Sequence, residues 1–266
     1  MAVYSAAIVY FSPTGSTYAV LRSVVQGMGV LDRRYVDLTL PEARLDFGGM
    51  CQEDVVILGA PVYDGGLPAV YEQSLQRLWS TGQPVVLCAT YGGLGCGNAL
   101  QHLHTVAQKA RLRPIAAGLF PARHPMWPQS RHALSEQALS AARELGFDAR
   151  FRLERCTRPM QMDTKAPCLP RRGWPEGTLR AMSPCRLLPV PQFNSACTQC
   201  GLCARECPTG AIAPTGMHID AGLCMRCQRC VELCPQGALN AGTGGLTGRV
   251  AGLLRRGNLP SDTILL

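Results

Sequence analysis

The feature that most constrains this chain is a repeated pattern of cysteines near its C-terminus. Eight of its 14 cysteines lie between Cys197 and Cys234, and they form two groups of four that are 27 residues apart. The first group is Cys197, Cys200, Cys203 and Cys207, and the second is Cys224, Cys227, Cys230 and Cys234. The same offset relates Pro208 to Pro235. Such self-similarity indicates two copies of one small unit, neither of which can bury a core alone.

Both groups follow the spacing C-x₂-C-x₂-C-x₃-C-P, which resembles that of bacterial ferredoxins. Thiolates are soft ligands that stabilise iron–sulfur clusters, and the pattern predicts two [4Fe–4S] clusters. Zinc is the competing metal because paired C-x-x-C units also build zinc sites, but a zinc ribbon needs only four ligands. Disulfides are disfavoured because the N-terminus has no signal-peptide pattern, which predicts a reducing cytoplasmic location.

The ferredoxin resemblance implies that the last cysteine of each group binds the cluster of the other group. One cluster then takes Cys197, Cys200, Cys203 and Cys234, and the other takes Cys207, Cys224, Cys227 and Cys230. The segment 192–242 is too small to fold well alone, so clusters are expected to supply much of its stability.

The first 150 residues alternate between apolar runs, typical of buried strands, and helical patterns. Strands are expected at 6–11, 34–38, 54–59, 84–89 and 114–120, and helices at 16–28, 67–79, 98–110 and 134–145. Five strands alternating with helices predict an α/β fold with a doubly wound parallel sheet. Ligands of such sheets bind beyond the carboxyl ends of the strands, so function in this half is expected in the loops there.

The loop after the first strand is rich in hydroxyl groups. Its candidate binding residues are Ser12, Thr14, Gly15, Ser16 and Thr17. The start of a helix attracts anions through its backbone N–H groups and dipole, and the lack of a lysine disfavours a nucleotide triphosphate. A terminal monophosphate held by neutral donors fits this loop. The alternative is an ordinary helix start in which Thr14 or Ser16 is the N-cap.

Two later loops each pair a tyrosine with closely spaced glycines. The second loop offers Pro61, Val62, Tyr63, Gly65 and Gly66, and the third offers Thr90, Tyr91, Gly92, Gly93, Gly95 and Gly97. A flat aromatic ligand needs close backbone approach and an aromatic face on which to stack. Together the three loops resemble the phosphate and flavin loops of flavodoxin-like proteins, which implies bound FMN. The second loop lacks the tryptophan of many flavodoxins, so Tyr63 or Tyr91 remains as the stacking ring.

These patterns divide the chain into four parts. They are a flavodoxin-like FMN-binding domain at 1–150, a basic proline-rich linker at 151–191, a two-cluster ferredoxin domain at 192–242 and a C-terminal tail at 243–266. Of the net charge of +8, the stretch 151–196 carries eight Lys or Arg against three Asp or Glu. It lacks the interleaved aromatics of a nucleic-acid surface, which leaves a solvated linker or a docking site for an acidic redox partner. No apolar run reaches the ~18 residues that a membrane span needs.

The whole chain resembles fusions of a flavodoxin-like domain to a two-cluster ferredoxin, known as flavodoxin–ferredoxin or EFR-type proteins. The resemblance implies an electron-transfer iron–sulfur flavoprotein that relays electrons between clusters and FMN and exchanges them with a redox protein partner. One alternative is a flavin-dependent reductase of a small molecule or quinone, fed by the clusters. No acid–base pair for such catalysis stands out in the sequence. Another alternative is a cluster-based redox sensor with an empty flavin site.

Overall fold

Five apolar runs of the N-terminal part form a parallel β-sheet. In the computed structural model, which describes residues 5–92, 97–122, 134–155, 189–214, 217–241 and 264–265, β4 and β6 are almost wholly buried, as is most of β1. The five strands are β1 (Ser5–Tyr10), β2 (Asp32–Asp37), β4 (Val55–Pro61), β6 (Pro84–Tyr91) and β7 (Arg113–Pro121). Continuous apolar runs suit this arrangement because helices cover both faces of the sheet.

The strand order identifies the topology. Along the sheet the five strands run β7-β6-β4-β1-β2, and all neighbouring pairs among them are parallel. Numbered by position in the chain, this is the flavodoxin-like order 2-1-3-4-5, which confirms the predicted fold class. The order reverses between β1 and β4, and ligands of such sheets bind at the carboxyl ends beside this point.

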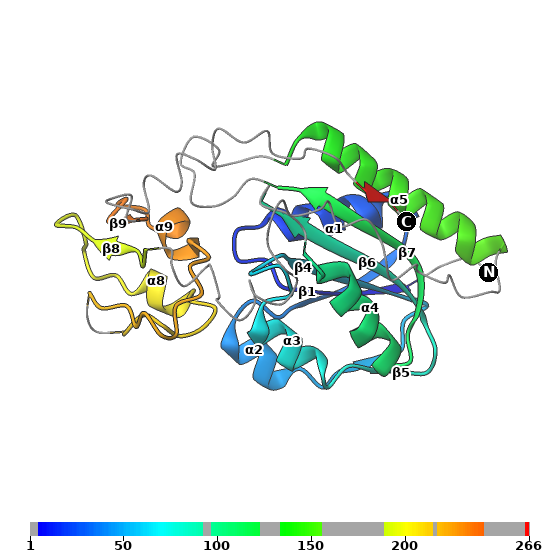
Figure 1. Cartoon of the computed structure of the whole chain (residues 1–266), viewed down its shortest axis with the longest axis horizontal. Helices are drawn as coiled ribbons and strands as arrows, with labels where there is room; N and C mark the ends of the chain where they lie inside the picture. Colours follow the sequence, from blue (N-terminus) through cyan, green and yellow to red (C-terminus); the bar gives the residue numbers. More distant parts are fainter. Residues whose placement is uncertain are drawn as a thin grey trace.

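Helices pack in two layers, one on each face of the sheet (Figure 1). The helices are α1 (Ser16–Met28), α2 (Pro41–Asp46), α3 (Ala69–Leu75), α4 (Ala99–Lys109) and α5 (Glu136–Arg155). α1 and α5 share one buried cluster with the sheet, and α3 and α4 share the other. α1 ends at Gly29, whose left-handed conformation lets its N–H bond the carbonyls of Val25 and Gln26.

The C-terminal cysteine segment forms a separate small unit beside α2 and the loop after β1 (Figure 1). Its elements are β8 (Gln192–Phe193), α8 (Leu202–Arg205), α9 (Arg229–Leu233) and β9 (Leu239–Asn240). β8 pairs with β9 in an antiparallel ribbon, and an isolated bridge joins Ile212 to Ile219. The 27-residue offset carries Ile212 onto Leu239 and Gln192 onto Ile219. Leu239 pairs with Phe193, the neighbour of Gln192, so the two pairings correspond to within one residue.

Three features of the fold differ from the expectations. α5 runs to Arg155, ten residues past the expected helix end and into the segment assigned to the linker. The helix expected to reach residue 79 ends at Leu75, and β5 (Trp79–Ser80) pairs instead with β3 (Met50–Cys51). β10 (Ile264–Leu265), from the expected C-terminal tail, adds an antiparallel edge strand next to β7.

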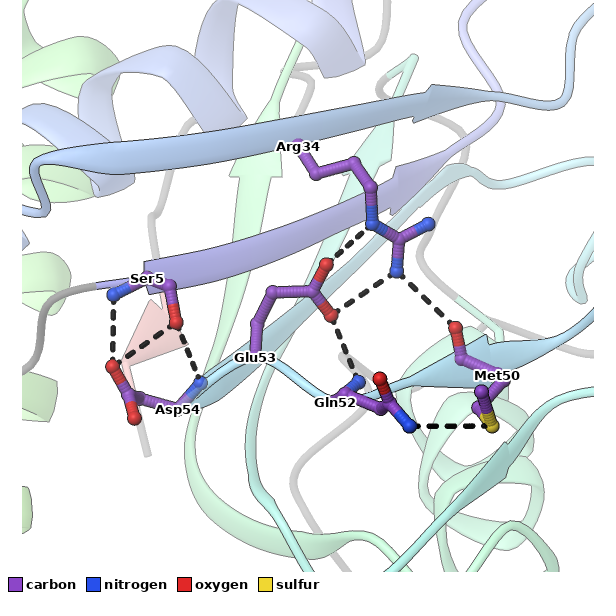
Figure 2. A network of polar contacts seen from close by, with 6 residues as sticks. All are labelled: Ser5, Arg34, Met50, Gln52, Glu53 and Asp54. Carbon is purple, nitrogen blue, oxygen red and sulfur yellow. Dashed lines mark hydrogen bonds and ion pairs between the residues drawn. The ribbon is translucent and has the colours of Figure 1, made fainter.

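A polar network ties together the opposite, amino-terminal ends of three strands (Figure 2). The Arg34 guanidinium pairs with Glu53 and donates to the carbonyl of Met50 at 3.2 Å. The Asp54 carboxylate accepts from the backbone N–H of Ser5 at 2.9 Å. Hydrogen bonding to Arg34 holds the pKa of the Glu53 carboxyl below its usual range. Because Arg34 is largely exposed, such a pair contributes at most about 1 kcal/mol. The network therefore stabilises the amino-terminal ends of these strands, which lie at the edge of the sheet opposite the expected ligand-binding edge.

Two glycines allow α1 and α5 to pack backbone to backbone. A Cβ atom on Gly146 would lie 2.0 Å from the carbonyl oxygen of Val24, and one on Gly27 would lie 1.9 Å from that of Arg143. Neither neighbour is a flexible side chain, so any larger residue would force the helices apart. The long α5 is therefore part of the domain core.

We predict that Gly146→Ala lowers the free energy of unfolding by about 1–3 kcal/mol, the usual cost of overpacking a core. This loss outweighs the gain of about 1 kcal/mol in helix propensity. Gly48→Ala is the matched control, because a Cβ atom at Gly48 has no neighbour within 4 Å. Urea unfolding of the full chain, followed by circular dichroism, measures both variants. Equal midpoints for the two would contradict the prediction.

Candidate functional site

The loop after β1 presents backbone N–H groups at the start of α1. The residue that caps α1 is Gly15, in a left-handed conformation with φ of 80°, and no side chain bonds the cap. The alternative in which Thr14 or Ser16 acts as N-cap is therefore wrong. Ser12 lies further back, and its Oγ accepts the N–H of Tyr18 at 3.0 Å.

Two N–H groups of this loop remain available to a ligand. Within the described residues the backbone N–H groups of Ser16 and Thr17 have no hydrogen-bond partner. The first turn of α1 also contains no acidic side chain that would repel an anion. A phosphate group fits this arrangement because it accepts several N–H bonds at once.

Hydrogen bonds join all three candidate loops at the carboxyl ends of the strands. Thr17 and Thr90 share a bond between their Oγ1 atoms of 2.8 Å, which ties the first loop to the third. The N–H of Val62 donates to the carbonyl of Thr90 at 2.8 Å, and that of Asn98 donates to Gly65 at 2.7 Å. The structure therefore brings the three loops to one edge, which we call the loop edge (residues 12–17, 61–66, 90–92 and 97).

The second loop is a tight turn. Tyr63 and Gly66 exchange backbone hydrogen bonds of 2.9 and 2.8 Å, and Asp64 and Gly65 between them have φ of 48° and 74°. Two successive positive φ values are typical of a type I′ turn. Gly97 of the third loop packs on this turn so closely that its Cβ would lie 2.0 Å from the Gly65 carbonyl oxygen. Gly93 and Gly95 lie outside the described residues.

The two candidate stacking tyrosines differ in burial. Tyr91 is only 2 % exposed and belongs to the core between the sheet, α3 and α4. Tyr63 is partly exposed in its turn. The ring that can meet a ligand at the surface is therefore that of Tyr63, whereas Tyr91 serves the core. Pro61, Val62, Gly65 and Gly92 are also partly exposed, and Gly66 and Thr90 are buried.

The cysteine unit repeats its backbone conformation as well as its sequence. Left-handed residues occur in three pairs at the 27-residue offset, namely Gln199 and Arg226, Gly201 and Gln228, and Gly210 and Gly237. A left-handed conformation costs a non-glycine residue roughly 1–2 kcal/mol, and Gln199, Arg226 and Gln228 all adopt it. Such strain persists where a ligand or tight packing holds the backbone, as at ligand clamps.

The eight cysteines gather in two groups that exchange their last members. Cys197, Cys200, Cys203 and Cys234 line one pocket. Burial raises the pKa of the thiols of Cys224, Cys227 and Cys230, and the nearby Cys207 raises the pKa of each further. Cys207 therefore lies with the second group, and Cys234 with the first.

The sulfur atoms also accept backbone hydrogen bonds. The N–H of Ala211 donates to Sγ of Cys207, and that of Ala238 to Sγ of Cys234, both at 3.3 Å. Hydrogen bonds of this kind tune the reduction potentials of iron–sulfur clusters. Burial raises the pKa of Cys227 to about 12, so its thiolate needs a nearby cation such as iron. The residues present thus fit an iron–sulfur cluster.

The remaining cysteines show no comparable grouping where they are described. Cys51 and Cys88 are buried, and burial raises the pKa of both thiols, to about 11 for Cys51, so both are inert at neutral pH. Cys96, Cys156, Cys168 and Cys185 lie outside the described residues.

Two arginines that were not predicted from the sequence join the cysteine unit to the sheet domain, which carries the loop edge. Nη1 of Arg229 donates to the carbonyl of Pro13 at 2.7 Å, and Nη2 of Arg44 donates to the carbonyl of Pro208 at 2.5 Å. Comparing the two copies of the repeat would have drawn attention to Arg229, because Leu202 occupies its position in the first copy.

A family model described as a 4Fe-4S dicluster domain matches residues 196–238. This match supports 4Fe–4S binding by the cysteine unit. No curated protein matches the chain. No helix among the described residues has the length and apolar character needed to cross a bilayer.

Solved flavodoxin structures resemble the N-terminal part. A flavodoxin from the domain Archaea is 14% identical, with a TM-score of 0.40, and the match covers 56% of this chain and 99% of that one. A WrbA-like flavodoxin from Agrobacterium tumefaciens is 16% identical, with a TM-score of 0.41 and coverage of 57% and 98%. A Fusobacterium nucleatum flavodoxin bound to flavin mononucleotide is 15% identical, with a TM-score of 0.38 and coverage of 56% and 96%.

We predict that removing iron with a chelator under anaerobic conditions unfolds the cysteine unit while leaving the sheet domain folded. The strained backbone at Gln199, Arg226 and Gln228 would lose the ligand that holds it. Hydrogen–deuterium exchange measured by mass spectrometry should show protection lost across 192–241 and kept in β1, β4 and β6. Protein incubated without chelator is the control, and unchanged exchange in 192–241 would contradict the prediction.

Proposed function

We propose that this chain is an electron-transfer iron–sulfur flavoprotein that relays electrons between two [4Fe–4S] clusters and FMN. The observation that carries the proposal is that the cysteine unit is hydrogen-bonded to the loop edge, through Arg229 and the carbonyl of Pro13. A flavodoxin-like domain and a dicluster unit in one chain are the combination found in EFR-type flavodoxin–ferredoxin proteins. A redox protein in the cytoplasm would be the external donor or acceptor.

Each cluster would be held by four thiolates, three from one copy of the repeat and one from the other. We assign Cys197, Cys200, Cys203 and Cys234 to one cluster and Cys207, Cys224, Cys227 and Cys230 to the other. The shared pocket of the first four and the proximity of Cys207 to the second group support this assignment. The N–H groups of Ala211 and Ala238 donate to Cys207 and Cys234, so the last cysteine of each copy has the same local environment.

FMN would bind at the loop edge. The N–H groups of Ser16 and Thr17 would hold its phosphate, and the half-exposed ring of Tyr63 would lie against the flavin. Clusters exchange single electrons whereas FMN can take up two, so the bound groups would connect one- and two-electron chemistry. The contribution of the chain itself is to hold both sites in fixed contact, which replaces a collision between two proteins by an intramolecular arrangement.

The composition of the purified protein tests this proposal directly. Protein isolated anaerobically should contain about eight irons, eight sulfides and one FMN per chain, as two four-iron clusters and one flavin require. Dithionite should bleach the broad cluster absorbance and the flavin bands together. Eight irons without flavin would overturn the FMN part and favour the sensor alternative. About one or two zinc ions in place of iron would overturn the cluster part.

The difference in burial between the tyrosines gives a sharper test of the flavin site. We predict that Tyr63→Ala weakens FMN binding by about tenfold. An aromatic contact contributes about 0.5–1.5 kcal/mol in addition to the effect of the surface area that it buries. Tyr91→Phe should change the affinity by less than about twofold, because it keeps the buried ring that the core needs. Fluorescence titration of flavin-free protein measures both constants. An equal loss in the two variants, or none in Tyr63→Ala, would contradict the placement of the flavin.

A further inference from the structure

The two copies of the cysteine repeat are alike in sequence pattern but unequal in burial. Cys227 is 7 % exposed and therefore buried, whereas its counterpart Cys200 is exposed. Arg226 is likewise buried, and its counterpart Gln199 is exposed. Arg226 donates to carbonyls within the unit, those of Ala221 and Cys224, and the neighbouring Met225 packs against the sheet domain. The second copy is thus more deeply covered than the first at these positions.

The prolines that follow the exchanged cysteines show the same asymmetry. Pro208, after Cys207, is buried, whereas Pro235, after Cys234, is exposed. Cys207 belongs to the group completed by Cys224, Cys227 and Cys230, so the covered proline and the covered copy lie around the same four ligands. We call this side of the unit, defined by Pro208, Met225, Gln228 and Arg229, the docking side.

Each contact that defines the docking side is made by a residue next to one of the second group's ligands. Pro208 accepts a hydrogen bond from Arg44, whose other nitrogen donates to the carbonyls of Leu38 and Thr39 at 3.0 and 2.7 Å. Met225, which follows Cys224, packs against the core that the sheet shares with α3 and α4. In the first copy the position of Met225 is occupied by Thr198, which is exposed.

Arg229 connects the docking side to the loop after β1, residues 12–17. Its Nε donates to the carbonyl of Glu206 at 3.0 Å, and its Nη2 pairs with the Glu206 carboxylate. This pairing leaves Nη1 to reach the carbonyl of Pro13, which lies buried between Ser12 and Thr14. Leu202, the counterpart of Arg229, has no donor to make such a bond.

An unpaired polar atom lies on the same side. Gln228 is 1 % exposed, and its Oε1 has no hydrogen-bond partner among the described residues. A buried acceptor without a partner costs free energy unless something satisfies it. Its counterpart in the first copy is Gly201, which has no side chain at all. The docking side thus carries a polar group that the outer copy lacks.

We infer that the cysteine unit docks on the loop edge and on α2 through its docking side, which combines the second copy with Pro208 of the first. Arg229 and Arg44 are the positioning residues. The inference rests on the proposed function, because ligand sets have a role only when clusters are bound. It makes Cys207, Cys224, Cys227 and Cys230 the inner ligand set. Cys197, Cys200, Cys203 and Cys234 form the outer set, nearest to solvent and to any external redox protein. The docking contacts use the carbonyls of Pro13 and Pro208, not the N–H groups of Ser16 and Thr17 that would hold FMN.

Hydrogen–deuterium exchange of the full iron-loaded chain tests the inference. Arg229→Ala should speed exchange in the peptide covering 11–20, in which the N–H groups of Ser12, Gly15, Tyr18 and Ala19 are hydrogen-bonded. We expect a change of about tenfold, the effect of losing one hydrogen bond to a charged group. Leu202→Ala, at the matching position of the first copy, should leave that peptide unchanged. Arg229→Lys keeps a cationic donor and should restore part of the protection, which a merely destabilised unit would not show.

Arg44→Ala removes the second contact, the bond to Pro208, by a change in the sheet domain, so it leaves every residue of the cysteine unit in place. It should speed exchange at 207–211 without lowering the iron content. Equal exchange at 11–20 in Arg229→Ala and Leu202→Ala, together with unchanged exchange at 207–211 in Arg44→Ala, would overturn the inference. If Arg229→Ala loses iron, the result for Arg44→Ala decides alone. Protein that docks as expected but lacks flavin would instead overturn the proposed FMN relay.

Discussion

The cysteine unit has almost no hydrocarbon core, and this constraint governs the rest of the structure. Between residues 189 and 241, the buried aliphatic side chains in the described part are those of Pro191, Pro208, Ala211, Ile212, Ala238 and Leu239. Six small or medium side chains cannot offset the conformational entropy of ordering about fifty residues. The unit therefore depends on bonds from its thiolates to metal and on contact with the larger domain. The thiolates come from both copies, and the contacts with the larger domain lie on the docking side.

The larger domain, by contrast, is stabilised by a buried hydrophobic core, so its loops are free to bind a ligand. Its sheet is buried between two helical layers, and Gly27 and Gly146 let α1 and α5 approach until their backbones touch. Because the sheet positions the loop edge, Ser16 and Thr17 can keep N–H groups unpaired without endangering the fold. The docked unit then lies against a rigid surface, held by single hydrogen bonds to Pro13 and from Arg44.

The sequence was sufficient to predict the fold class, because that depends on local patterns. Apolar runs that end at turns located the strands, and the helix expected at 16–28 is α1 to the residue. The misses all depend on long-range contacts. Trp79 pairs with Met50 in β5 and β3, and α5 continues through Gly146 because α1 accommodates that glycine. Helix propensity alone predicts that a helix ends at a glycine.

The candidate site was predictable in its residue types but not in its burial. Tyr63 and Tyr91 are equivalent in the sequence, each beside glycines, and only packing against α3 and α4 distinguishes the core residue from the accessible one. The side of the cysteine unit that meets the loop edge was equally hidden, since the contact joins Arg229 to Pro13 across 216 residues of sequence.

An internal repeat, however, allows equivalent positions of its two copies to be compared within one chain. A structural requirement of cluster binding must appear in both copies, as the cysteines, the prolines and the left-handed positions do. A residue that occurs in one copy only, such as Arg229 opposite Leu202 or Gln228 opposite Gly201, serves something outside the repeat. The differences between the copies therefore carry information about the partner surface, and the similarities carry information about the metal. Here the differences coincide with burial, since Arg226 and Cys227 are buried whereas their counterparts Gln199 and Cys200 are exposed.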